Sequence, residues 1–237
     1  MLSFIIPAYN EEFELPATLA SVHRAAQNTQ HDYEIVVADD GSTDRTAEIA
    51  TQRGARIVTI NRRQIAASRN AGAHAAQGDI LFFVDADTQI NESQIVDAIA
   101  ALNSGYVGGS ARVRIQGFVP LWGRLFLRAF STVYFGLNLG AGAFLFTTRE
   151  AFDRVGGFDE DFFVGEEVYF SLALRKLGRF KILRTPILTS GRKLRMYSGL
   201  QFFRKILALA IRGRRAAQSR DGLDIWYDGR RETSNPS

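Results

Sequence analysis

The stretch LFFVDADT, residues 81–88, decides the fold of this chain. An apolar run over residues 80–84, suited to a strand buried on both faces, ends in two carboxylates one residue apart, Asp85 and Asp87. Ligands of open α/β sheets bind beyond the carboxyl ends of the strands, and Asp-x-Asp offers hard oxygen ligands to a divalent cation. The alternative is a solvated turn, where Asp is common, and the rest of the chain decides between the two.

Strands and helices alternate on the way to this stretch. Apolar runs predict strands over residues 2–6, 33–38 and 56–60, the first of them ended by Pro7. Amphipathic or capped segments predict helices over 14–26, 43–52 and 65–76. The alternation predicts an α/β fold with a right-handed, doubly wound, mostly parallel central sheet of the Rossmann-like kind.

The second half of the chain has a different character. A helix over 91–102 and a strand over 106–115 are followed by an apolar segment, 119–135, that we interpret as a core helix; a lipid-touching or acceptor-lining helix is the alternative. A glycine-bearing loop then leads to a helix with Glu166 and Glu167 in its first turn. A short strand is expected at 180–183, then a basic loop over 189–198, an amphipathic helix up to 220 and a loosely held tail over 221–237.

Composition excludes several classes of protein. The 237 residues hold no cysteine, so disulfides and thiolate metal sites are excluded, and the three histidines lack metal-ligand spacing. Neither G-x-G-x-x-G nor a P-loop is present. The net charge of +4 arises from basic residues between 175 and 220, which predicts anionic partners on that side; we expect no nucleic acid. The first residues do not read as a signal peptide and no run is long enough to span a bilayer, so we expect a soluble or peripheral, cytoplasmic protein.

Three acidic groups follow strand ends or begin a helix, and a parallel sheet would bring them to one edge. An early Asp can accept a hydrogen bond from a nucleobase or ribose, an Asp pair can hold Mg²⁺ or Mn²⁺ against a diphosphate, and a third carboxylate can take a proton from an attacking hydroxyl. Together they predict transfer from a nucleotide diphosphate. The groups are Asp39 with Asp40, Asp85 with Asp87, and Glu166 with Glu167.

Five ordered motifs resemble a family 2 glycosyltransferase of the GT-A fold. They are FIIPAYNEE, VVADDGSTDRT, ASRNAGAHAAQGDILFFVDADT, GAFLFTTREAFDRVGGFDE and GEEVYFSLALRKLG, spread over about residues 2–185. The resemblance implies an inverting transferase that uses a UDP- or GDP-sugar and Mn²⁺ or Mg²⁺. It also implies one domain over 1–220, with a nucleotide-sugar-binding half at 1–115 and a smaller acceptor half at 116–220.

The resemblance also assigns roles by position. Glu167 would be the general base, beside Glu166, although the family usually ends this motif in Glu-Asp. Asp85 and Asp87 would bind the metal. The nucleotide-sugar would contact Pro7, Ala8, Tyr9, Glu11, Asp40, Arg69, Asp85 and Ala86.

Two departures from the family narrow the function. No histidine follows His74, so a late histidine cannot complete a metal shell, and the Gln-x-x-Arg-Trp motif of processive members is missing, which favours transfer of a single sugar. An inactive nucleotide-sugar-binding module is one alternative, which filled carboxylate positions disfavour. A sugar nucleotidyltransferase is another, which the lack of a Gly-rich basic loop after the first strand disfavours.

The acceptor is the least determined partner, either lipid-linked or a cell-envelope glycan. Residues 199–220 place apolar side chains on one helical arc and basic ones on the other, as interfacial helices do. We interpret this helix as touching the anionic cytoplasmic face of a membrane; the alternative is that it packs on the core.

Overall fold

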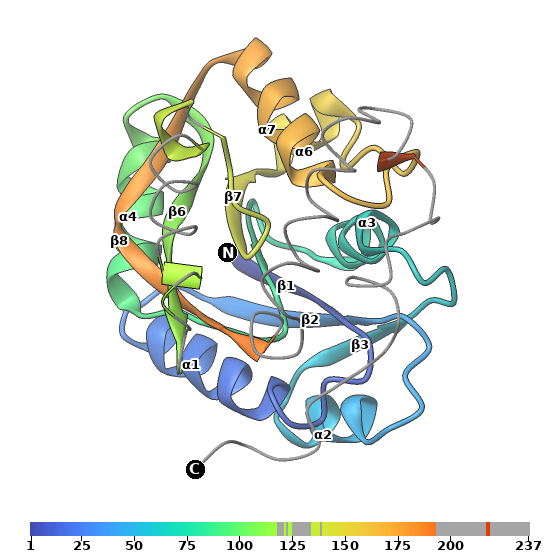
Figure 1. The fold of residues 1–237 in the computed structure, drawn as a ribbon. Helices are drawn as coiled ribbons and strands as arrows, with labels where there is room; N and C mark the ends of the chain where they lie inside the picture. The colour runs from blue at the N-terminus through green and yellow to red at the C-terminus, as the bar shows by residue number, and fades with distance from the viewer. Residues whose placement is uncertain (118–120, 122, 125–133, 138, 193–216, 219–237) are drawn as a thin grey trace.

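The computed structural model describes residues 1–117, 121, 123–124, 134–137, 139–192 and 217–218. They form one eight-stranded sheet with helices on both faces (Figure 1). In chain order the elements are β1 Leu2–Ala8, α1 Leu15–Gln27, β2 Tyr33–Asp39, α2 Thr46–Gln52, β3 Arg56–Thr59, α3 Ile65–Ala75, β4 Ile80–Val84, β5 Thr88–Gln89, α4 Glu92–Asn103, β6 Tyr106–Gln116, β7 Phe144–Thr148, α6 Arg149–Val155, α7 Glu166–Leu177 and β8 Arg179–Ser190.

The first half is the parallel, alternating unit that the sequence predicts. β1 lies between β2 and β4, β3 pairs with β2, and all three pairings are parallel. Every residue of β1 is buried because helices cover both faces. One detail differs: β1 does not stop before Pro7 but continues to Ala8, with Pro7 opposite Ala38. Pairing with β4 already ends at Ile5, so this proline stands where β1 has a single neighbour, a position that tolerates it.

In the second half the sheet has both parallel and antiparallel pairings. Here one strand was missed, and another is longer than predicted. The order of the sheet is β3-β2-β1-β4-β7-β6-β8-β5, with β7 antiparallel to both β4 and β6. We did not predict β7, whose residues lie within the quoted motif that begins GAFLFTT. β8 is a twelve-residue strand rather than the short one expected at 180–183, because it pairs in parallel along most of β6 despite Pro186. It ends beside β5, so residues 189 and 190 of the predicted basic loop belong to a strand.

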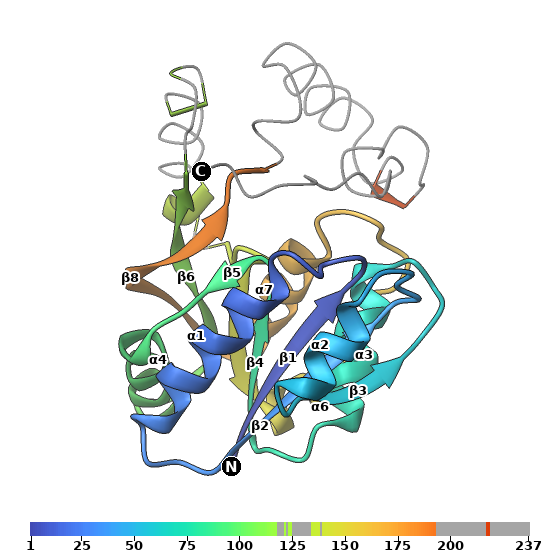
Figure 2. The same cartoon turned by 90° about the horizontal axis from the view of Figure 1, so that it is seen from below.

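The core has two layers of apolar side chains, one on each face of the sheet. One layer contains Phe4, Phe82 and Phe144 and is covered by α1, α2 and α4. The other contains Phe83, Phe158 and neighbouring rings under α3, α6 and α7. Figure 1 shows α1 and α2 below strands β1–β3 and α3, α6 and α7 above them. The doubly wound α/β prediction is thereby confirmed, and β1, β2 and β4 end at one edge, the far end of β1 from the N-terminus (Figure 2).

Two predicted helices fall largely outside the described residues, namely those at 119–135 and 199–220. Within the second, Ala217 is buried, and its carbonyl accepts a hydrogen bond from the Phe163 amide at 2.7 Å. No helix among the described residues is long and apolar enough to cross a bilayer. The division into halves at residue 115, the membrane contact and the tail at 221–237 stay predictions.

Candidate active site

The backbone of the Asp-x-Asp turn is held on both sides. The Thr88 amide donates to the Asp85 carbonyl at 3.0 Å, which closes the turn after β4, and the Asp85 amide donates to the Ala143 carbonyl before β7 at 3.2 Å. Between the aspartates, Ala86 is buried, and its carbonyl accepts a hydrogen bond from the Thr18 hydroxyl of α1 at 2.8 Å. The two carboxylates therefore leave a fixed turn, with half-buried side chains at the sheet edge.

Asp85 belongs to a buried ionic group that we call the Arg69 group: Arg69, Asp85 and Glu166. Arg69, on α3, is 1% exposed and donates to Asp85 at 2.9 Å and to Glu166 at 2.5 Å. It also donates to the Gly142 carbonyl at 3.0 Å, and a Cβ at Gly142 would lie only 3.0 Å from the guanidinium. The two carboxylates hold the pKa of Arg69 above its usual value against the effect of burial. Arg69 thus joins the Asp-x-Asp turn to the start of α7.

Asp87 belongs to a second ionic group, the Arg192 group: Arg192, Glu11 and Asp87. Arg192 follows β8 and donates to both oxygens of Glu11, at 2.5 and 2.6 Å, while its Nη2 lies 3.3 Å from Asp87. Thr189 donates to the other oxygen of Asp87 at 3.3 Å. The Glu11 amide donates to Thr46 at 2.8 Å, which fixes the loop after β1. Glu11, expected in the nucleoside pocket, is here the anchor of an arginine.

The charges at this edge suit a divalent cation. Two arginines stand among the carboxylates of Glu11, Asp85, Asp87 and Glu166, so the two groups together retain a formal charge of −2. Among the described residues no three His, Cys, Asp or Glu side chains are arranged to hold a metal ion. Mg²⁺ and Mn²⁺ commonly bind through one or two carboxylates plus substrate phosphates, and each carboxylate offers about four acceptor positions. Asp85 and Asp87 therefore fit as such ligands.

Glu167 lies next to the Arg69 group but is not part of its hydrogen bonds. It is the second residue of α7, which begins after Gly165, whose φ of +77° suits glycine, and its carboxyl carbon lies 3.5 Å from where a Cβ on Gly142 would stand. Burial, followed by the negative charge of Glu166, raises the pKa of Glu167 to about 8, against the opposing charge of Arg69. The group is therefore mostly protonated at neutral pH.

Asp40 holds a loop. Its two carboxylate oxygens accept hydrogen bonds from the amides of residues 62, 63 and 64, at 2.7 to 2.8 Å, and from Ser68 at 3.1 Å. This fixes the entry to α3 and hence the position of Arg69. Arg63, in that loop, stacks over the Tyr9 ring at 3.2 Å from its centroid. Contact of Asp40 with a nucleobase stays a prediction. The nucleobase would have to donate to a carboxylate oxygen that already accepts hydrogen bonds from the protein.

The structure brings most of the predicted residues to one edge. Pro7 and Ala8 end β1, and Tyr9 and Glu11 follow it. The Arg192 group connects Glu11 to the Asp-x-Asp turn, and the Arg69 group connects that turn to the start of α7. Sequence reasoning missed Arg192 and Thr189. Glu11 and Arg192 are 181 residues apart, so no local pattern reveals their contact. The one available signal was the basic run after β8, which we assigned to a membrane.

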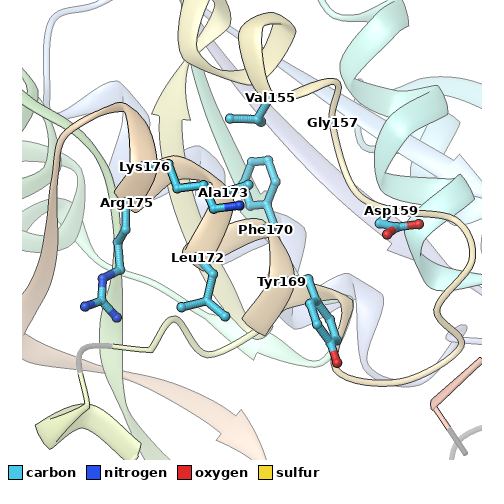
Figure 3. A pocket seen from close by; sticks show the side chains of 9 residues that line it. All are labelled: Val155, Gly157, Asp159, Tyr169, Phe170, Leu172, Ala173, Arg175 and Lys176. Carbon is cyan, nitrogen blue, oxygen red and sulfur yellow. The ribbon is translucent and has the colours of Figure 1, made fainter. Parts of the chain in front are cut away.

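A separate cavity of about 620 Å³ lies on the outer side of α7 (Figure 3). Its lining comes from α7 and from the end of α6 and the loop after it, and includes Asp159, Tyr169, Leu172 and Lys176. None of the carboxylates of the two ionic groups lines it, nor does Glu167. We therefore do not place the reaction there.

Comparison with known proteins agrees with this geometry. The family model described as "Glycosyl transferase family 2" matches residues 3–183. The undecaprenyl-phosphate 4-deoxy-4-formamido-L-arabinose transferase of Pseudomonas fluorescens is 36% identical over 120 residues, which are 47% of this chain and 35% of that protein. The protein of the same name from Edwardsiella ictaluri is 37% identical over 117 residues, 44% of this chain and 34% of that protein. The matches thus span about a third of the length of these curated relatives.

Solved structures show the same fold. The mannosyltransferase PcManGT from Pyrobaculum calidifontis, in complex with GDP-Man and Mn²⁺, superposes with a TM-score of 0.66 at 20% identity, covering 90% of this chain and 64% of that one. TarS of S. aureus, in complex with UDP-GlcNAc, gives a TM-score of 0.62 at 21% identity, covering 80% of this chain and 58% of that one. At these identities the likeness concerns the fold alone.

Proposed function

The chain belongs to glycosyl transferase family 2, and on that premise we propose that it is an inverting transferase that moves one sugar from a nucleotide diphosphate to a lipid-carrier phosphate. The observation that carries the proposal is the Arg69 group, which joins the Asp-x-Asp turn to the Glu166-Glu167 pair in one buried network. The network holds the candidate metal ligand Asp85 beside the Glu166-Glu167 pair, which is the arrangement that transfer needs.

The donor half of the proposal rests on the charge at the sheet edge. Asp85 and Asp87 would hold Mn²⁺ or Mg²⁺, which when bound neutralises a diphosphate leaving group. Tyr9, under Arg63, and the loop held by Asp40 would receive the nucleoside. Support comes from fold neighbours solved with GDP-Man and Mn²⁺ or with UDP-GlcNAc, which leaves UDP and GDP as the donors to test.

The acceptor half rests on Glu167. In the transfer, an acceptor oxygen bonds to the anomeric carbon while the bond from that carbon to the diphosphate breaks and its electron pair leaves with the diphosphate. A hydroxyl acceptor must also lose a proton, and burial together with the charge of Glu166 keeps most of Glu167 protonated at neutral pH, so only a minor fraction is ready to accept one. An ionised lipid phosphate has no proton to lose, and a neutral Glu167 would not repel it.

The names of the relatives support the same class of acceptor, because they act on undecaprenyl phosphate. Such an acceptor lies in a bilayer, so we propose that the protein works at the cytoplasmic face of a membrane, with residues 199–220 as the contact. Vesicle flotation with and without these residues tests that part: salt-sensitive binding to anionic vesicles is expected, and it should be lost on truncation.

A transfer assay tests the reaction. UDP- and GDP-sugars are offered with undecaprenyl phosphate or with a hydroxyl acceptor, in Mn²⁺ or EDTA, and the anomeric configuration of the product is read by NMR. With the lipid phosphate we expect Mn²⁺-dependent transfer with inversion, and Glu167→Gln within about tenfold of wild type. If the acceptor is a hydroxyl, the variant should lose the roughly 10²- to 10⁴-fold of general-base help, and the lipid-phosphate proposal fails.

A further inference from the structure

Arg192 is a buried arginine at the reactive edge with no role in the proposal so far. Its side chain is 10% exposed, and Glu11, its bidentate partner, is 7% exposed. A bidentate pair between guanidinium and carboxylate is the rigid form of such a contact, so Glu11 fixes where the positive charge lies. The charge lies 3.3 Å from Asp87, one of the two candidate metal ligands.

The guanidinium keeps capacity for a further anion. Its contacts to Glu11 and Asp87 use at most three of its five N–H groups. Asp87 is half-buried, so the cluster opens at the edge where the diphosphate would lie. Arg69 differs here, because it is 1% exposed and its contacts are all to its own network and to Gly142.

We propose that Arg192 is a second cation for the donor, which binds the diphosphate beside the metal and is aimed by Glu11. This rests on the proposed function in one respect, namely that the donor is a nucleotide diphosphate. Two opposite effects follow. Beside Asp87, the positive charge opposes a bare metal ion, whereas it attracts a diphosphate. A residue that only stabilised the fold would weaken both kinds of binding.

Calorimetry with simple probes separates these effects. Wild type, Arg192→Gln and Arg192→Lys are titrated with Mn²⁺ alone, and with inorganic pyrophosphate, UDP and GDP in the presence of Mn²⁺. For Arg192→Gln we expect Mn²⁺ alone to bind at least about threefold more tightly, and pyrophosphate and the accepted nucleotide about 10- to 100-fold more weakly. Arg192→Lys, which keeps the charge but not the fork, should fall between wild type and Arg192→Gln.

Two further variants keep the test decisive. Arg184→Gln, at an exposed position of the same strand β8, is the matched control and should bind every probe as wild type does. If Arg192→Gln does not fold, the double variant Glu11→Gln/Arg192→Gln replaces the ion pair by two amides of similar shape and is used in its place.

The outcomes distinguish this proposal from the one it rests on. Wild type that binds pyrophosphate and UDP or GDP, with unchanged affinities in Arg192→Gln, would overturn the role of Arg192 and leave the transferase proposal standing. Loss of both Mn²⁺ and pyrophosphate affinity in the variant would make Arg192 a fold element and also overturn the role. Wild type that binds none of the diphosphates would overturn both proposals.

Discussion

The two ionic groups at the sheet edge have the same composition and different depths. Each contains one aspartate of the Asp-x-Asp turn, one arginine and one glutamate. Arg69 and its glutamate, Glu166, are 1% and 4% exposed, whereas Arg192 and its glutamate, Glu11, are 10% and 7% exposed. The depth that differs is therefore that of the arginine and the glutamate, because both aspartates are half-buried, Asp85 at 29% and Asp87 at 15%. The deeper group joins two secondary-structure elements, and the shallower one lies where a ligand would enter. The same three residue types thus hold the scaffold in one place and, in our proposal, face the substrate in the other.

The largest effect should follow from removing Asp87, the candidate metal ligand in the Arg192 group. Asp87→Ala should abolish Mn²⁺-dependent binding of the nucleotide diphosphate and lower transfer by about 10²- to 10³-fold, because the diphosphate charge loses its compensation. Calorimetry with and without Mn²⁺ measures this. Asp97→Ala, at an exposed position of α4, is the control. Undiminished Mn²⁺-dependent affinity in Asp87→Ala would remove the Asp-x-Asp turn from the site.

The two arginines should differ in what they do for stability. Arg69→Met leaves Asp85 and Glu166 without their cation in the interior, at a cost of about 3–5 kcal/mol of unfolding free energy, the usual range for a broken buried pair. Arg192→Met should cost less, about 1–3 kcal/mol, because Arg192 is 10% exposed and Arg69 only 1%, so the ion pair that is lost lies closer to solvent. Urea unfolding at pH 7 measures both. Equal losses would contradict the distinction between a scaffold group and a ligand group.

Some strands of the sheet could be predicted from the sequence, and others could not. Alternating apolar runs predict β1 to β4 and their helices because each of these elements has its own local pattern, and the places of Asp40, Asp85 and Asp87 follow from the strand ends, although β4 pairs with the distant β1. β7 was missed because it directly follows a glycine-containing stretch without a strand pattern and pairs with β4 and β6, which lie far away in the chain.

Within the site, the same limit separates Arg69 from Arg192. Arg69 lies in a motif sixteen residues from Asp85, so its nearness to the site could be read, although its partners could not. Arg192 and Glu11 are 181 residues apart and meet only through the tertiary structure, and a run of basic residues fits a membrane surface equally well from the sequence alone. A contact between the segment after β8 and the loop after β1 depends on the tertiary structure and leaves no local pattern in the sequence.

Glu167, next to the Arg69 group, should make the stability of the protein depend on pH. Because the pKa of Glu167 is about 8 in the folded protein and about 4.5 in the unfolded chain, the folded state holds more protons between those values. Stability must therefore fall as the pH rises from about 5 to 8 and level off above that. We expect wild type to lose on the order of 1–3 kcal/mol more than Glu167→Gln over this range, with the half-buried position reducing the full linkage value. Equal slopes for the two proteins would mean that Glu167 titrates normally.

The smallest effect concerns how Asp87 is oriented. Thr189 donates a hydrogen bond from its neutral hydroxyl to one oxygen of this carboxylate at 3.3 Å, while Arg192 approaches the other at the same distance with a full charge. A hydroxyl-to-carboxylate bond this much longer than the usual O–H···O distance contributes only about 1 kcal/mol, so Thr189→Val should raise the donor KM by less than about tenfold and leave kcat unchanged. Valine preserves the shape and the β-branching of a strand residue, so the fold should persist. Steady-state kinetics at saturating Mn²⁺ measure the change. If Thr189→Val weakened donor binding as much as Arg192→Gln does, the Thr189 hydroxyl, and not the guanidinium, would be what orients Asp87 for the donor. Arg192 would then have no special role in the Arg192 group.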